Sequence, residues 1–218
     1  MKSYQLHHVL YIIAFMFAAV FGLLWLFYYV IPEPFPSEEY YILLIMYAIM
    51  LMATALIFKT KNLSKIHSSI GFNPVKLNAI IIATASALFI WFIDYIYQTK
   101  VLNIDNSIGA NIWYKQQANL VYVFLSTAII TPVIEEMLFR GIILQSLRNH
   151  LSKTVSAIIV SALFTLIHFE VLQIPILFLA SIIYVWLTYK YKSIIPAIIA
   201  HIINNCLTFF YYISIIGI

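Results

Sequence analysis

The sequence predicts an all-α protein, a polytopic transmembrane helical bundle with about seven spans. Hydrophobic residues make up 64% of the 218 residues, only 9% are charged, and the mean hydropathy is +0.97. Soluble domains carry about 25% charged residues, so this chain could not cover a water-facing surface with polar groups. A helix needs about 20 apolar residues to cross the bilayer core. The apolar content therefore allows about seven crossings.

Long apolar runs give the expected spans in chain order. The first run, residues 9–31, is longer than the apolar core of a secretory signal and has no small-residue cleavage site after it. We expect it to remain as a span that ends at three closely spaced prolines, since proline removes a backbone donor. The single cysteine, Cys206, excludes an intrachain disulfide. The other expected spans are residues 40–58, 77–97, 119–139 with helical sequence continuing towards 149, 155–168, 174–189 and 194–216.

Lysine and arginine positions predict the orientation of these spans. Basic residues near span ends are retained on the cytoplasmic side of a membrane. In a seven-span arrangement one side receives only Lys100 and Lys115, and the other side receives all remaining basic loop residues. We therefore expect a multi-pass protein of the cell membrane with a cytoplasmic amino terminus and an external carboxyl terminus. The net charge of +4 lies in short clusters beside the spans, so membrane lipid is an expected partner and nucleic acid is not.

Several strongly polar side chains fall inside the predicted spans, where they are costly and point to function. With the helical rise of about 1.5 Å per residue, Glu135, His168 and Asn205 all lie roughly 20–23 Å from the cytoplasmic anchors of their spans. This coincidence on three helices predicts one intramembrane site, although each residue alone has an ordinary structural interpretation as an interhelical hydrogen-bonding group. The polar residues concerned are Glu135, Glu136, Arg140, His168, His201, Asn204 and Asn205.

Helical spacing separates the two neighbouring glutamates. Residues four apart share one face of a helix, so Glu136 is expected to form a structural ion pair with Arg140, and His201 lies on one face with Asn205. Glu135 is rotated by about 100° from its neighbour, and no basic residue stands four positions from it in the sequence, so we interpret it as the carboxylate available for chemistry. The Thr131–Pro132 step just upstream is expected to free a backbone carbonyl and to widen a cavity beside Glu135.

Most designs of intramembrane hydrolase do not fit the sequence. None of the six histidines is followed by glutamate, which excludes the His-Glu-x-x-His zinc motif. The only aspartates, Asp94 and Asp105, lie at or beyond the outer edge, which argues against an aspartyl dyad. The five glycines form no Gly-x-Ser-x-Gly elbow. A water activated by glutamate and histidine remains, together with the alternative of a metal held by His168, His201 and a glutamate from separate helices.

Three motifs carry a family resemblance. Residues 135–140 read Glu-Glu-x-x-x-Arg, residues 164–168 read Phe-x-x-x-His, and residues 201–205 read His-x-x-x-Asn. Together and in this order they resemble the CAAX protease and bacteriocin-processing (CPBP) family, which includes the type II CAAX prenyl proteases. The resemblance covers about residues 120–207, and the link at 189–193 lacks a glycine that is often found there in relatives.

The resemblance implies a metal-independent intramembrane glutamate endopeptidase without a cofactor. It implies that Glu135 is the general base on a water, that His168 positions this water and shuttles its proton, and that His201 and Asn205 donate hydrogen bonds to the oxyanion. Glu136 and Arg140 would support the fourth helix. Residues 119–218, with spans four to seven, would then be the catalytic core, and residues 1–118 would hold the first three spans and their loops.

The size of the chain resembles that of bacterial family members linked to bacteriocin immunity, peptide maturation and regulation. A peptide or a membrane protein is the implied substrate, and prenylated CAAX proteins are not the expected one. The sequence does not indicate an oligomeric state. Two other functions fit the same polar residues: a proton-coupled transporter, which would cleave nothing, and a non-catalytic immunity or scaffold protein, which would keep its function without Glu135.

Overall fold

The computed structural model describes residues 70–103, 120–168 and 170–216. Within these ranges every regular element is helical and there is no strand, so the all-α class is confirmed for them. The first two predicted spans, residues 9–31 and 40–58, lie outside the described residues.

Three described helices are long and apolar enough to cross a membrane, namely Leu77–Val101, Val171–Tyr191 and Ile195–Ile215. They agree with the predicted spans at 77–97, 174–189 and 194–216, and they identify the chain as a membrane protein. The elements that form them are α4 (Leu77–Ile96) with the π-helix η1 (Tyr97–Val101), the 3-10 turn η4 (Val171–Gln173) with α10 (Ile174–Tyr191), and α11 (Ile195–Ile216).

The predicted span at 155–168 differs from the structure. Helix α9 (Lys153–Leu166) has 14 residues, which at about 1.5 Å per residue is shorter than the bilayer core of about 30 Å. It ends before His168, which lies in the turn that follows. The total of about seven spans therefore stays a prediction.

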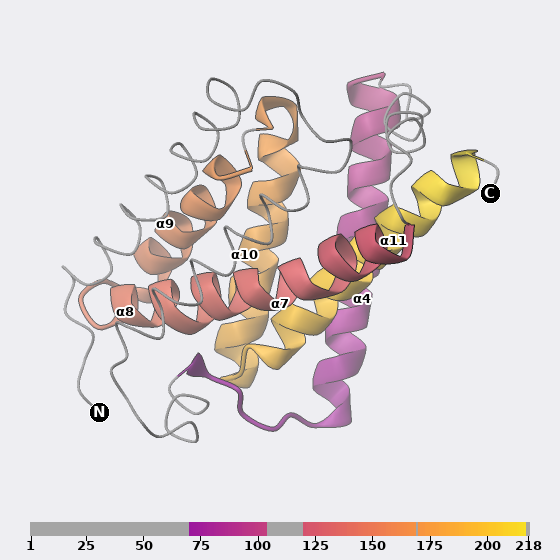
Figure 1. The fold of residues 1–218 in the computed structure, drawn as a ribbon. Helices are drawn as coiled ribbons and strands as arrows, with labels where there is room; N and C mark the ends of the chain where they lie inside the picture. Colours follow the sequence, from indigo (N-terminus) through magenta and orange to yellow (C-terminus); the bar gives the residue numbers. More distant parts are fainter. Residues whose placement is uncertain (1–69, 104–119, 169, 217–218) are drawn as a thin grey trace, which may run out of the picture.

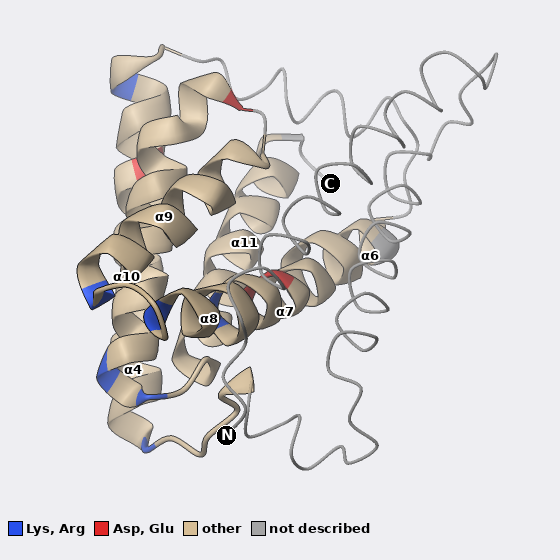
Figure 2. Cartoon of the chain, turned by 90° about the vertical axis from the view of Figure 1, so that its left-hand side faces the viewer, with Lys and Arg blue, Asp and Glu red and all other residues tan. Residues whose placement is uncertain are grey.

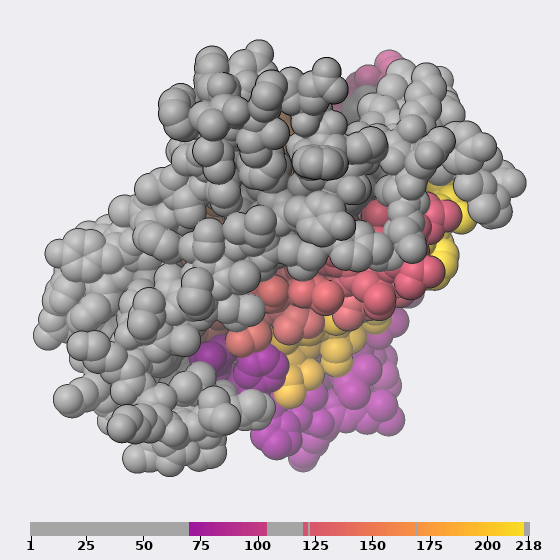
Figure 3. Space-filling model, in the orientation of Figure 1, coloured from indigo at the N-terminus to yellow at the C-terminus, as the bar shows by residue number. Residues whose placement is uncertain are grey.

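The predicted fourth span is one helical rod from Leu120 to Arg148, but it is not a uniform α-helix. Figure 1 shows that this rod runs across the bundle, in front of the upright α4 and α10, and Figure 3 shows it at the surface directly beside α11, with α4 below. Tighter and wider turns alternate along it. Its parts are α6 (Leu120–Val123), η2 (Phe124–Ile130), α7 (Thr131–Glu136), η3 (Met137–Ile143) and α8 (Leu144–Arg148), where η2 and η3 are π-helical.

Small side chains allow α4, α10 and α11 to pack closely. Ala79, Ala83 and Ala87, each four residues apart on α4, have no exposed surface. They belong with Ala197 and Ala200 of α11 to the packed part of the bundle. Small residues at such contacts are how helices approach one another in lipid, where hydrophobic burial gives little driving force between spans. The opposite face of α4 carries exposed side chains suited to lipid, among them Leu88, Phe89 and Phe92.

A second apolar cluster joins the crossing rod to α9, α10 and α11. Phe139, Phe164 and Ile142 are each 1% exposed within it, and the rings of Phe139 and Phe164 meet edge to face at 5.2 Å. Gly141 permits a close approach at this point, because a Cβ there would lie 2.9 Å from the carbonyl oxygen of Ile70. The rod is thereby fixed against the chain segment that leads into α4.

The turn between α10 and α11 is made without glycine. Lys192 ends α10 in the left-handed region with φ 50°, a conformation that costs a non-glycine residue about 1–3 kcal/mol. The carbonyl of Lys192 accepts a hydrogen bond from Asn73 Nδ2 at 2.7 Å, and Ser193 Oγ donates to the Asn73 carbonyl at 2.7 Å. These two bonds to one asparagine stabilise a turn that is made without glycine.

The orientation of the bundle can be tested at two exposed positions. Lys100 lies at the end of η1 and Asn149 directly follows α8, and the lysine distribution predicts that they lie on opposite sides of the membrane. In a Cys206→Ser background, a cysteine at position 100 is expected to react with a membrane-impermeant thiol reagent on intact cells. A cysteine at position 149 is expected to react only after the cells are opened. The reverse labelling pattern would invert the predicted orientation.

Candidate active site

The predicted site residues meet at one cavity of about 520 Å³. Its wall is built by α4, the crossing rod, the end of α9, α10 and α11. Glu135, His168, His201 and Asn205 all line it, so the structure brings together the four side chains that were expected to be catalytic. Glu136 and Arg140 lie behind this wall and are 0% exposed.

His201 lies between the two glutamates. Its Nδ1 is 3.0 Å from Glu136 Oε1, and its Nε2 is 3.7 Å from Glu135 Oε2. A carboxylate oxygen accepts hydrogen bonds, so His201 donates through Nδ1 to Glu136 and presents Nε2 towards Glu135. Helical spacing alone predicted Arg140 as the partner of Glu136 and gave no sign of this second partner on α11.

The expected pair of Glu136 and Arg140 is confirmed. Arg140 Nη1 donates to Glu136 Oε1 at 2.9 Å, and Nη2 donates to Ser181 Oγ at 2.7 Å. The guanidinium carbon also lies 4.6 Å from the centre of the Phe164 ring and 5.3 Å from that of Tyr184, where cation–π attraction offsets part of its loss of water. The pair therefore links the crossing rod to α9 and α10.

Aromatic rings hold the two imidazoles. The ring of Tyr184 stacks on His201 at 5.0 Å with 24° between the planes. The ring of Phe164 lies 4.7 Å from that of His168 and 5.9 Å from that of His201. Sequence reasoning identified Phe164 only as a motif residue and missed Tyr184 and Ser181, because nothing in the apolar run of α10 distinguishes its inward-facing residues from its lipid-facing ones.

The tautomer of His168 follows from its hydrogen bond to the backbone. Its Nδ1 is 2.7 Å from the backbone carbonyl of Phe164. A carbonyl oxygen only accepts, so Nδ1 carries the hydrogen, and in the neutral ring Nε2 is the nitrogen with the lone pair. His168 thus presents a proton acceptor to the cavity.

The position of Asn205 is explained by the irregular helix opposite it. The N–H of Thr131 bonds to the carbonyl of Ser126, five residues back. The next donor in that register is Pro132, which has no N–H, so the carbonyl of Thr127 lacks its intrahelical partner. Asn205 Nδ2 donates to this carbonyl at 3.1 Å. Proline therefore frees a backbone carbonyl of this helix, as expected, and Asn205 uses one of its two amide hydrogens to bind it.

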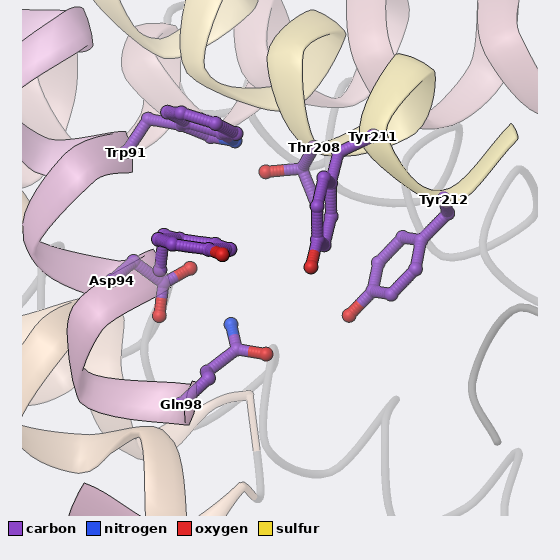
Figure 4. Close-up of a pocket in the computed structure, with 7 residues that line it drawn as sticks. Trp91, Asp94, Gln98, Thr208, Tyr211 and Tyr212 are labelled. Atoms are coloured by element: carbon purple, nitrogen blue, oxygen red, sulfur yellow. The ribbon is translucent and has the colours of Figure 1, made fainter. Parts of the chain in front are cut away.

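The cavity continues towards the far ends of α4 and α11. Figure 4 shows Trp91 and Asp94 of α4 and Gln98 of η1 facing Thr208, Tyr211 and Tyr212 of α11. Four of these residues, Asp94, Gln98, Thr208 and Tyr212, also line the large cavity. The cavity therefore runs from Glu135 to the ends of the helices that the lysine distribution places outside.

No cluster of three or more His, Cys, Asp or Glu side chains within the described ranges is arranged to hold a metal ion. The two glutamates and His201 are instead joined to each other and to Arg140. Metal independence itself stays a prediction, and it is tested below.

Comparison with known proteins bears on the same part of the chain. Residues 117–207 match the family described as Type II CAAX prenyl endopeptidase Rce1-like. The resemblance to the CAAX protease family is confirmed for this segment. The Rce1-like segment contains the four residues expected to be catalytic and the Glu136–Arg140 pair. Because the family is a protease family, the match supports a peptidase activity. Searches of the curated proteins and of the solved structures gave no match.

The buried ion pair predicts that Arg140 stabilises the folded protein. Arg140→Ala strands Glu136 inside the bundle, and breaking a buried pair in this way typically costs about 3–5 kcal/mol. We expect a matching loss in the free energy of unfolding, measured in detergent, nearer the lower value because His201 still donates to Glu136. The double variant Glu136→Gln with Arg140→Met should recover part of that loss. Lys76→Ala, at an exposed basic residue outside both cavities, is the control. A fully stable but inactive Arg140→Ala would move Arg140 into the catalytic role.

The link between Pro132 and Asn205 can be tested by a double-mutant cycle. Asn205→Leu leaves the Thr127 carbonyl without its donor and is expected to destabilise the protein by about 1–3 kcal/mol. Pro132→Ala supplies a backbone N–H to the same carbonyl, so Asn205→Leu should cost less in that background, by about 0.5 kcal/mol or more. Asn204→Leu, at the neighbouring amide, should show no such coupling. Strictly additive costs for Pro132→Ala and Asn205→Leu would disprove the link.

Proposed function

We propose that this protein is an intramembrane glutamate endopeptidase that hydrolyses a peptide bond with a water activated by Glu135 and His168. The observation that carries the proposal is the shared cavity, in which Glu135, at 5% exposure, lies with two histidines and an asparagine inside a segment similar to a protease family. A secluded site of this kind strengthens electrostatic interactions with a reacting group.

Glu135 is assigned the general base. In the proposed step a water loses a proton to the Glu135 carboxylate as its oxygen bonds to the scissile carbonyl carbon, and the carbonyl oxygen becomes an oxyanion. The separation of 3.7 Å between Glu135 and His201 is longer than a hydrogen bond, and catalytic contacts often shorten only when substrate is bound. No metal or covalent intermediate enters this step.

His201 and Asn205 are assigned to the oxyanion. Asn205 spends one amide hydrogen on the Thr127 carbonyl and has a second to donate. His201 presents Nε2 to the same cavity while Glu136 holds its Nδ1, so a protonated ring would donate to the oxyanion from a fixed position. A preorganised donor of this kind contributes about 2.7–4 kcal/mol to catalysis.

His168 is assigned the proton transfer to the leaving group. Its Nε2 has the lone pair and its orientation is set by the Phe164 carbonyl, so it can help to position the water, take up a proton and return it. As the oxyanion collapses, the carbon–nitrogen bond breaks and the amine leaves with that proton. The products are an amine and a carboxylic acid, and the acid then loses its proton to solvent to become a carboxylate.

The substrate would be a peptide or a membrane protein that reaches the cavity from the bilayer. A role in bacterial peptide processing, bacteriocin immunity or regulation belongs to the proposal and rests on the family resemblance. The transporter and scaffold alternatives share these polar residues, and the similarity of the segment to a protease family favours cleavage over both.

The general-base role predicts a loss of activity without a loss of fold. Glu135→Gln keeps the size and the hydrogen-bonding end of the side chain but cannot take a proton from water, so cleavage should fall by at least about 10²-fold. Cleavage is measured by mass spectrometry of membrane peptides in cells that carry each variant, and folding by thermal unfolding. Glu170→Gln, the same change at an exposed residue on the rim of the cavity, is the control. Cleavage by Glu135→Gln at the rate of the unmodified protein would refute the mechanism.

Metal independence gives a separate prediction. Purified protein that retains less than one equivalent of any transition metal should cleave its substrate at an unchanged rate in excess chelator. The check is metal analysis of the same sample used for the assay. If activity disappears and zinc restores it, His168 and His201 are ligands instead.

A further inference from the structure

A second cavity, of about 450 Å³, lies at the other end of the described bundle. It opens where α8 ends, α9 begins and α10 turns into α11. Three basic side chains from three different places in the chain line it, Arg148, Lys153 and Lys192. The described residues that line it include no aspartate or glutamate, and its other polar groups are mainly amides and hydroxyls, among them Asn73, Gln145 and Ser193.

These three basic side chains have no acidic partner in the described part of the chain. The ion pairs there involve only Glu135, Glu136, Arg140 and His201, all at the first cavity. Figure 2 shows the same separation of charge, with most of the blue at the end formed by α8, the end of α10 and the start of α4, and the red elsewhere. Three like charges around one hollow repel one another, and an anion in that hollow would remove the repulsion.

The walls of this second cavity are held in place. The Arg148 guanidinium lies 4.9 Å from the centre of the Tyr189 ring, and the Tyr189 hydroxyl donates to the carbonyl of Lys153 at 3.1 Å. On the opposite wall, the backbone N–H of Ile194 donates to the Gly71 carbonyl at 3.0 Å. The basic residues are therefore arranged around a formed site.

Helix dipoles do not fully explain these positions. Basic residues stabilise the carboxyl end of a helix, which suits Arg148 at the end of α8 and Lys192 at the end of α10, but they are unfavourable at the amino end. Lys153 is the first residue of α9. Its charge is thus located where the helix dipole opposes it, which an anionic ligand would offset.

We propose that this cavity binds a phosphate group, namely that of an anionic membrane lipid. The cavity lies level with the end of one candidate span at Tyr191 and the start of the next at Ile195, which is the depth of lipid headgroups. Basic pockets between spans recognise such headgroups. A free phosphate ion has the same charge chemistry, so the experiment separates the two sources.

The test measures retention of phosphatidylglycerol by the full-length protein, using native mass spectrometry and nanodiscs of stated composition. The variant Arg148→Gln, Lys153→Gln, Lys192→Gln removes the three charges of the cavity. The matched control Lys76→Gln, Lys100→Gln, Lys190→Gln removes three charges at residues that do not line it. Each basic residue beside a bound anionic headgroup contributes about fivefold to its affinity, so the loss of all three should weaken binding by at least about tenfold. The control residues do not line the cavity, so their loss should change binding within about twofold.

Several outcomes decide the proposal. Equal loss in the two triple variants would show diffuse surface attraction and overturn it, and so would equal retention of phosphatidylcholine and phosphatidylglycerol. Competition by millimolar inorganic phosphate as effective as that of the lipid would overturn the lipid assignment. If the triple variant does not fold, Lys153→Gln alone, at an exposed side chain, should weaken retention by about fivefold, and an unchanged affinity there would also overturn the proposal. None of these measurements depends on peptidase activity.

Discussion

The buried carboxylate of Glu136 is the constraint on which the rest of the described structure depends. An isolated charge inside a membrane bundle is costly, and it is tolerated only with close partners. Glu136 has two, Arg140 on its own rod and His201 on α11, and Arg140 extends the link to Ser181 on α10. The crossing angle and axial position of three helices must satisfy these bonds at once. The same bonds place His201 beside Glu135, so stability and the geometry of the candidate site have one origin.

A second constraint comes from the irregular backbone of the crossing rod. A π turn changes which carbonyl each N–H reaches, and such turns occur often at functional sites. In this wider register the Thr127 carbonyl would accept a hydrogen bond from the backbone N–H of residue 132. Residue 132 is proline and has no N–H, so Asn205 donates to that carbonyl instead. An amide is thereby fixed at the wall of the cavity by an interaction between helices. Without the proline, a regular helix would satisfy its own carbonyl and leave Asn205 with no fixed orientation.

The two cavities divide the molecule by charge. The larger one contains carboxylates and imidazoles and extends along α4 and α11, whereas the smaller one is basic and lies at the opposite helix ends. Elsewhere between α4 and α11, the buried alanines Ala83, Ala87, Ala197 and Ala200 belong to one packed cluster. A membrane protein has little hydrophobic force between its helices, and its polar interactions therefore carry much of the specificity of assembly.

The sequence by itself determined the features that depend only on neighbouring residues along the chain. Hydropathy is a property of each segment, so it predicted the helices at 77–97, 174–189 and 194–216, and the four-residue spacing predicted the Glu136–Arg140 pair because any helix brings those positions together. The motifs also indicated which polar residues share a site. Only the tertiary structure decided that His201 bonds Glu136, that Tyr184 and Ser181 complete its surroundings, and that α9 stops before His168. Those features depend on how helices far apart in sequence cross, and on π turns that shift their faces, which no periodicity within one segment encodes.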